Sequence, residues 1–152
     1  MRKKLLLVTS LFLVFLLTVT GCSKKQTTVK DREGNDVVLP EKIERIISTA
    51  PSNTEVLVEL GLADKLIAVD NYSKDVKGVP SDIEYIDFSN PDAEAIISLN
   101  PDMIIASGHN RSGENDSPFA LIEEAGISVF YIPSSDSING IYEDIKFMAS
   151  LT

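Results

Sequence analysis

The chain has one cysteine and one histidine among its 152 residues. Cys22 therefore has no partner for a disulfide bond within the chain. A bound transition metal needs several histidine, cysteine or carboxylate ligands that converge on the ion, and His109 is the only imidazole. We expect no resident metal and no intrinsic cofactor, and we expect any metal to arrive inside an organic chelate.

The motifs of common α/β enzymes are also missing. No Gly-x-Gly-x-x-Gly follows the first expected strand and no Gly-Lys-Ser/Thr occurs. The sequence therefore lacks the glycine-rich loops that bind nucleotide phosphates. There is no Gly-x-Ser-x-Gly turn, and a Ser-His-Asp triad would depend entirely on His109. The polar, glycine-containing loop around His109 offers nothing that would hold the ring rigidly. We predict no enzyme activity and keep an extracytoplasmic α/β enzyme as the third hypothesis.

An excess of positive charge is missing as well. The formal net charge is −9, and cleavage of a signal would lower it to −12 by removing the three charges of Arg2, Lys3 and Lys4. Binding of nucleic acid needs a basic face that contacts phosphates, so we expect no nucleic acid partner. An acidity of this size mostly indicates solubility.

The N-terminus has the features of an export signal. The apolar run Leu5–Val19 follows basic residues and is too short to cross a bilayer comfortably, which is typical of a secretory signal. Thr20, Gly21 and Cys22 resemble the bacterial lipobox, in which the cysteine is lipidated and the signal is cleaved before it. We predict a lipoprotein signal peptide at residues 1–21 and a polar tether at 22–27, anchored by Cys22 at the extracytoplasmic face of the cell membrane. The alternative is an uncleaved signal anchor.

Residues 28–152 predict one α/β domain. The segment 28–39 has two short apolar runs around a Glu33–Asp36 turn, which predicts a small hairpin. From Arg45 onward, short apolar runs alternate with amphipathic segments, as in repeated βα units with a parallel sheet. We therefore predict a three-layer, Rossmann-like lobe with a central, mostly parallel sheet and helices on both faces.

The expected elements follow from apolar runs and from capping residues. Strands are predicted at residues 45–48, 66–69, 103–106 and 129–132. The first helix is expected to open at Ser52 with a Ser52–Glu55 capping box and to end at Gly61. The next two helices are expected to start at Asn90-Pro91 and Ser117-Pro118, the second of these ending at Gly126. A last helix carries an apolar stripe of Ile138, Ile141, Ile145 and Met148.

A binding site is expected at one edge of this sheet, because segments that leave the carboxyl ends of parallel strands gather there. The segments are residues 49–54, 70–73, 87–90, 107–116 and 133–137. They are rich in Ser, Asn, Asp and Gly, with Tyr72, Phe88, His109 and Arg111 among them. This mixture suits a ligand held by rings and hydrogen bonds, although His109 is equally well explained as a surface histidine without a role.

The segment Arg45–Glu55, with Pro51-Ser52-Asn53-Thr54-Glu55 after a strand, resembles the opening of bacterial ABC-importer substrate-binding proteins for iron-siderophores, cobalamin and haem. The likeness continues through Asp92–Ile105 and Gly126–Val129 and covers residues 28–152. It implies a lipid-anchored receptor that binds such a chelate and delivers it to an ABC permease with its ATPase.

Members of that family have two α/β lobes with the ligand between them, and residues 28–152 match the N-terminal lobe only. We therefore expect a truncated reading frame or a fragment that lacks the C-terminal lobe. The alternative hypothesis is a remnant that binds no ligand, or an accessory surface lipoprotein that touches the permease only.

The resemblance also implies roles for individual residues. In cobalamin-binding members, aromatic rings lie against the corrin at the positions of Tyr72 and Phe88; alternatively, these rings only seal the sheet edge. The start of the helix at Ser52, Asn53 and Thr54 presents N–H groups to acceptor atoms of a ligand, or is simply an ordinary helix cap.

Two charged residues complete the expected site. Arg111 would meet a siderophore carboxylate or a haem propionate. With no second arginine near it, a neutral or weakly anionic chelate fits better than a tris-catecholate. Glu94 matches the glutamate that docks on permease arginines in the family, or else it only complements a helix dipole.

Overall fold

The computed structural model describes residues 26–110 and 118–152. The expected signal peptide, Cys22 with most of the tether, Arg111 and Ser117 lie outside the described residues. In the part of the chain that is described, no helix combines the length and the hydropathy needed to cross a bilayer.

The centre of the fold is a five-stranded sheet in which all paired strands are parallel. Its spatial order is β5-β4-β3-β6-β7. The strands are β3 (Ile46–Ser48), β4 (Leu66–Asp70), β5 (Glu84–Ile86), β6 (Met103–Ser107) and β7 (Ser128–Ile132). Four of them lie within one residue of the predicted bounds, whereas β5 is a largely exposed edge strand without the apolar run by which the others were predicted.

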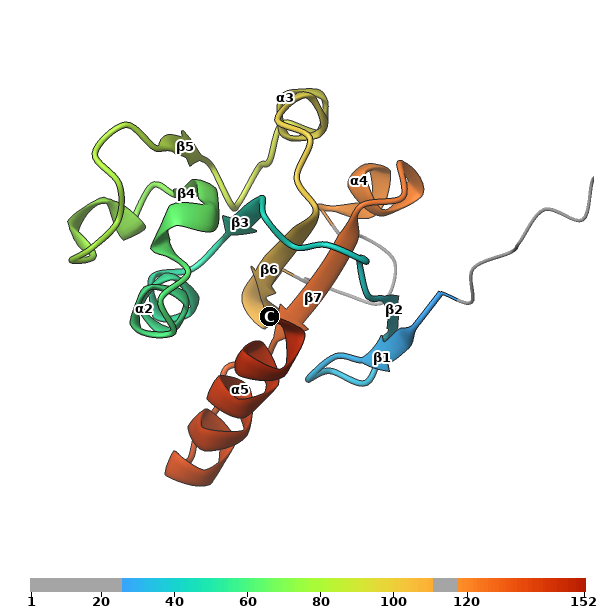
Figure 1. Cartoon of the computed structure of the whole chain (residues 1–152), viewed down its shortest axis with the longest axis vertical. Helices are drawn as coiled ribbons and strands as arrows, with labels where there is room; N and C mark the ends of the chain where they lie inside the picture. Colours follow the sequence, from blue (N-terminus) through green and yellow to red (C-terminus); the bar gives the residue numbers. More distant parts are fainter. Residues whose placement is uncertain (1–25, 111–117) are drawn as a thin grey trace, which may run out of the picture.

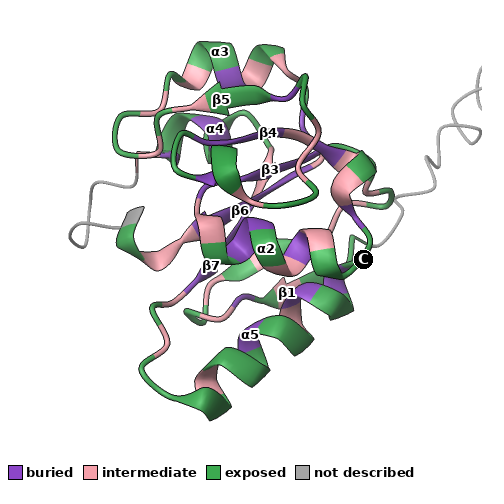
Figure 2. Cartoon of the chain, turned by 90° about the vertical axis from the view of Figure 1, so that its left-hand side faces the viewer, coloured by how far each residue is buried: buried purple, intermediate pink, exposed green. Residues whose placement is uncertain are grey.

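Helices cover both faces of the sheet (Figure 1). On one face, α2 (Pro51–Glu59) and α5 (Ile138–Leu151) pack on a core that contains Ile46 and Ile105. On the other, α3 (Ala93–Ser98) and α4 (Ala120–Glu124) pack on a core that contains Ile47 and Ile104. Consecutive strand residues point to opposite faces, and the central strands β3 and β6 are buried on both sides, whereas the edge strand β5 is largely exposed (Figure 2). The prediction of a three-layer α/β lobe is confirmed.

The predicted hairpin consists of β1 (Thr28–Lys30) and β2 (Asp36–Val38), paired antiparallel. Asp31, between them, is only 6% exposed and accepts the N–H groups of Glu33 and Asn35 at 2.9 and 2.8 Å. Its second oxygen accepts the N–H of Tyr131 in β7 at 3.1 Å. The hairpin thereby satisfies a backbone donor on the edge strand of the sheet.

The expected N-cap of α2, Ser52, lies two residues after the observed one. Ala50 is the N-cap and makes no side-chain capping bond, so the Ser52–Glu55 capping box does not form. Pro51 takes the first helical position, where its fixed φ fits the helix and its missing N–H removes nothing.

Whereas α2 begins earlier than predicted, the next two helices begin later. In α3 the carboxylate of Asp92, and not Asn90, caps the helix by accepting the N–H of Ala95 at 3.0 Å. In α4 the N-cap is Phe119, whose ring is fully buried in the core under this helix. Burial of that ring places the first helical turn after it.

The predicted glycine terminators are confirmed. Gly61 and Gly126 have φ of +79° and +86°, the left-handed conformation that glycine adopts without strain. After α2, the N–H of Leu62 donates to the carbonyl of Leu57 at 3.0 Å and that of Gly61 to Val58 at 2.9 Å. This is the Schellman pattern of helix termination.

Candidate functional site

The strand order reverses between β3 and β6. The chain runs from β3 to β4 and β5 on one side and then returns to β6 on the other side of β3. Open α/β sheets bind ligands outside the carboxyl ends of their strands at such a reversal. A cavity of about 550 Å³ lies at this place. Its floor is fixed by two bonds, from the N–H of Thr49 to the Ile105 carbonyl at 3.1 Å and from the N–H of Ser107 to Thr49 Oγ1 at 3.0 Å.

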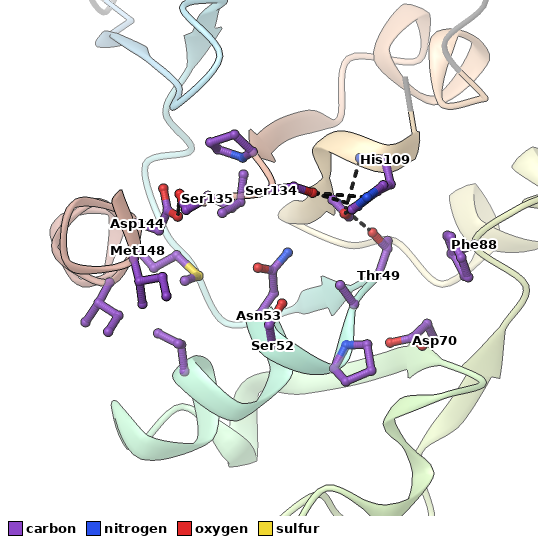
Figure 3. Close-up of a pocket in the computed structure, with 18 of the residues that line it drawn as sticks. Thr49, Ser52, Asn53, Asp70, Phe88, His109, Ser134, Ser135, Asp144 and Met148 are labelled. Carbon is purple, nitrogen blue, oxygen red and sulfur yellow. Dashed lines mark hydrogen bonds between the residues drawn. The ribbon is translucent and has the colours of Figure 1, made fainter. Parts of the chain in front are cut away.

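The cavity gathers residues that follow all five strands, together with one side of α5 (Figure 3). Five of the predicted ligand residues line it: Ser52, Asn53, Tyr72, Phe88 and His109. The sheet edge that the sequence predicts is therefore where these residues meet. Arg111 lies outside the described residues.

Two aromatic rings stand at one end of the cavity. The centroids of Tyr72 and Phe88 are 5.8 Å apart and the ring planes meet at 67°, an edge-to-face contact. Tyr72 is 71% exposed. Its backbone is held by Asp70, which is fully buried, accepts the Tyr72 N–H at 2.8 Å and accepts the Ser73 hydroxyl. Tyr72 thus presents its ring to the outside of the lobe and not to its core.

The start of α2 presents hydrogen-bond donors to the cavity. The first N–H groups of a helix have no partner within it, and here neither Ala50 nor Pro51 supplies a side-chain cap. Asn53 is 3% exposed, and its Nδ2 has no hydrogen-bond partner among the described residues. A buried donor without a partner costs about 1–3 kcal/mol, so such a group calls for an explanation.

Thr54 does not line the cavity, unlike its neighbours Ser52 and Asn53. It is fully buried, and its Oγ1 bonds Ser48 Oγ at 2.8 Å, the Ala50 carbonyl at 3.0 Å and Ser73 Oγ at 3.0 Å. The Thr54 hydroxyl therefore joins the start of α2 to the end of β3 and to the turn after β4.

His109 lies in the short 3-10 helix η3 (Gly108–Asn110) at the end of β6. Its Nδ1 is 2.8 Å from the hydroxyl of Ser134, in the loop after β7. This contact comes from a loop distant in sequence, whereas the sequence analysis considered only the loop around His109. A Cβ on Gly108 would lie 3.1 Å from Pro133 Cα, so glycine lets the two loops approach.

The lining residues from α5 were missed by the sequence analysis. Ile141, Asp144, Ile145 and Met148 all face the cavity. Asp144 is 6% exposed, is paired with Arg32 Nε at 2.6 Å and accepts the Ser135 hydroxyl at 2.5 Å. The apolar stripe on α5 was the available signal, but only Met148 of the stripe is buried, while Ile138 is 77% exposed.

The charged groups of the cavity are acidic. Among its described lining residues Asp70 and Asp144 carry charge, and none is a lysine or arginine. Within residues 26–110 and 118–152, no three His, Cys, Asp or Glu side chains are placed to hold a metal ion. Elsewhere on α5, the Lys146 ammonium bonds Glu143 Oε1 at 2.8 Å and lowers the pKa of that carboxyl.

Glu94 lies away from the cavity. It occupies the first turn of α3 and is exposed. Ile96, two residues later, is buried against the sheet. The helix therefore turns Glu94 outward, where it complements the helix dipole and is accessible to another protein.

Curated relatives match most of this chain, but the matched part is less than half of the length of each relative. An uncharacterized ABC transporter substrate-binding lipoprotein, YvrC, from Bacillus subtilis is 33% identical over 124 residues, which are 80% of this chain and 38% of that protein. A vitamin B12-binding protein from Yersinia pestis is 37% identical over 89 residues, 58% of this chain and 30% of the relative.

Solved structures agree on the fold. A possible iron-binding (periplasmic solute-binding) protein from Staphylococcus epidermidis superposes with a TM-score of 0.65 at 30% identity, over 74% of this chain and 43% of that one. The periplasmic vitamin B12-binding protein BtuF of Vibrio cholerae superposes with a TM-score of 0.60 at 29% identity, over 72% and 41%. The periplasmic binding protein family matches residues 46–152. The chain therefore belongs to the periplasmic binding protein family.

Proposed function

We propose that this chain is the N-terminal lobe of an extracytoplasmic substrate-binding lipoprotein of an ABC importer. In this proposal it binds a metal chelate such as a ferric siderophore, cobalamin or haem, and delivers it to the permease and its ATPase. The observation that carries the proposal is the cavity at the reversal of strand order, with Tyr72 and Phe88 at one end. Flat macrocycles and chelating rings pack well on exposed aromatic faces.

The proposal assigns no chemistry to the lobe beyond binding. The chain has a single histidine and a single cysteine, so the metal is expected to remain in its organic ligand. A lipid on Cys22 would hold the lobe close to the permease, and Glu94 would be the charged contact on α3. The names of the relatives support this role, since they are substrate-binding, vitamin B12-binding and iron-binding proteins.

The test is an equilibrium titration of the full 152-residue chain in mild detergent with cyanocobalamin, haem and a ferric hydroxamate siderophore. We expect saturable binding of at least one of them, followed by calorimetry or by the ligand's absorbance. Absence of saturable binding at about 1 mM of each chelate, which corresponds to about −4 kcal/mol, would contradict the proposal. It would favour the alternative of a lobe that touches the permease without holding a ligand.

A further inference from the structure

Asn53 is a buried polar side chain of the cavity whose amide nitrogen no described residue accepts. It is 3% exposed, and its Nδ2 has no hydrogen-bond partner in the described chain. Figure 3 shows the side chain rising from the start of α2 into the cavity, toward the space between Asp144 and His109. Buried amides in folded proteins are nearly always bonded, so this donor is placed for a partner outside the chain.

The backbone at the same place adds donors of the same kind. α2 has nine residues and begins with Pro51, after an N-cap that makes no side-chain bond. The N–H groups of Ser52 and Asn53 therefore have no partner in the helix, and the positive end of the helix dipole lies there. Backbone and side chain together favour an acceptor oxygen on whatever enters the cavity.

The charge of the cavity favours a neutral oxygen on the ligand over a negatively charged one. Asp70 and Asp144 line it, and both are at least nine-tenths buried. The cation that pairs with Asp144 is Arg32, which is not a lining residue. No lysine or arginine stands among the described lining residues. Among the described lining residues, a carboxylate on the ligand would meet these two acids and no cation, whereas a neutral carbonyl would accept from the donors of α2 without adding a negative charge beside the acids.

We propose that Asn53 and the free N–H groups at the start of α2 form a subsite for uncharged carbonyl oxygen. This subsite would select chelates whose buried edge carries amides or esters over chelates whose edge carries carboxylates. The inference rests on the proposed function and names the ligand chemistry of that same cavity. Asn53 is then a specificity-determining residue, whose Nδ2 has no partner among the described residues and would bond the chelate when it binds.

The experiment compares two probes that differ only in this chemistry, haem and haem dimethyl ester, with dicyanocobinamide as a third probe that carries amides. The full chain in detergent is titrated with each. We expect the ester to bind at least tenfold more tightly than haem. In Asn53→Leu, which keeps the branched shape and removes the donors, the affinity for the ester and for cobinamide should fall about tenfold.

Thermal unfolding of the same variants separates binding from folding. Because Asn53→Leu removes a buried donor that has no partner, we expect its Tm to rise by about 2–4 °C while its affinity falls. Asn53→Asp, which replaces the donor by a carboxylate, should lose at least as much affinity as Asn53→Leu. The control is Asn139→Leu, the same change at an exposed position of α5 outside the cavity lining, and it should leave the affinities unchanged.

Two outcomes would overturn the subsite and leave the proposed function standing. One is haem binding as tightly as its ester or more tightly. The other is an Asn53→Leu chain that binds the ester as the wild type does, with a lowered Tm, which would identify an asparagine with a structural role only. If the wild type binds none of the three probes and no ferric hydroxamate siderophore either, the proposed function fails together with the subsite.

Discussion

Tyr72 and Phe88 meet edge to face across the end of the cavity, with ring centroids 5.8 Å apart. They come from different connections, one after β4 and the other after β5. The two strands are neighbours in the sheet, so their parallel pairing brings the rings together. An aromatic surface at the site thus follows directly from the topology.

Removal of the Tyr72 ring should affect binding much more than folding. Because the side chain is 71% exposed, we expect Tyr72→Ala to change the free energy of unfolding by less than about 0.5 kcal/mol. Loss of the ring contact should weaken chelate binding about threefold to tenfold, measured by calorimetry. Tyr85→Ala is the control, since Tyr85 is also exposed, at 44%, and does not line the cavity. Equal affinities of the Tyr72 variant and the wild type would show that the ring makes no contact with the ligand.

In contrast to Tyr72→Ala, the substitution Thr54→Val at the start of α2 should lower the stability of the fold. The hydroxyl has three partners in the interior, and its loss leaves Ser48 and Ser73 with fewer bonds. We expect the free energy of unfolding to fall by about 1–3 kcal/mol in urea denaturation. The neighbouring Ser52→Ala, at an exposed position, should change it by less than about 0.5 kcal/mol. A Thr54 variant as stable as wild type would contradict the role of this hydroxyl in joining α2 to the sheet.

The layers of the fold could be predicted from the sequence because buried parallel strands are short apolar runs and helices end at glycine. The helix starts were less predictable, since several residues compete for the N-cap. Near α3, Asn90 and Asp92 are both good capping residues, and the structure uses Asp92. Near α2, Pro51 itself takes the first helical position and moves the cap back to Ala50.

The site was predictable to the extent that topology defines it. Polar and aromatic residues after parallel strands must share an edge, and this rule places Asn53, Phe88 and His109 together. Contacts between distant segments have no local signature. The bond of His109 to Ser134 and the pairing of Asp144 with Arg32 depend on how the loop after β7 and the hairpin pack, which no periodicity encodes.

The pairing of Arg32 with Asp144 should contribute to stability far more than the exposed pair in the same hairpin. Asp144 is nearly buried, with 9% of its side chain exposed, and its Oδ1 lies 2.6 Å from Arg32 Nε. Asp144→Asn should lower the free energy of unfolding by about 1–3 kcal/mol in urea. Asp36→Asn breaks the pair with Lys30, whose side chains are 66% and 67% exposed, and should change it by less than about 0.5 kcal/mol. Similar losses in both variants would show that burial does not strengthen the Arg32 pair.

Replacement of the exposed Glu94 by glutamine keeps its shape and removes its charge. If Glu94 docks on the permease, Glu94→Gln should leave chelate affinity unchanged and weaken capture by the permease–ATPase complex in liposomes about fivefold or more, with a weaker dependence on salt. If the carboxylate only complements the dipole of α3, the variant should lose a few tenths of a kcal/mol of stability and be captured normally. Glu55→Gln, at an exposed position of α2 on the opposite face of the sheet, is the matched control. Because α2 and α3 lie on opposite faces, loss of capture in the Glu94 variant alone would assign the docking surface to α3. An equal loss in both variants would show that the effect comes from net charge and not from docking at Glu94.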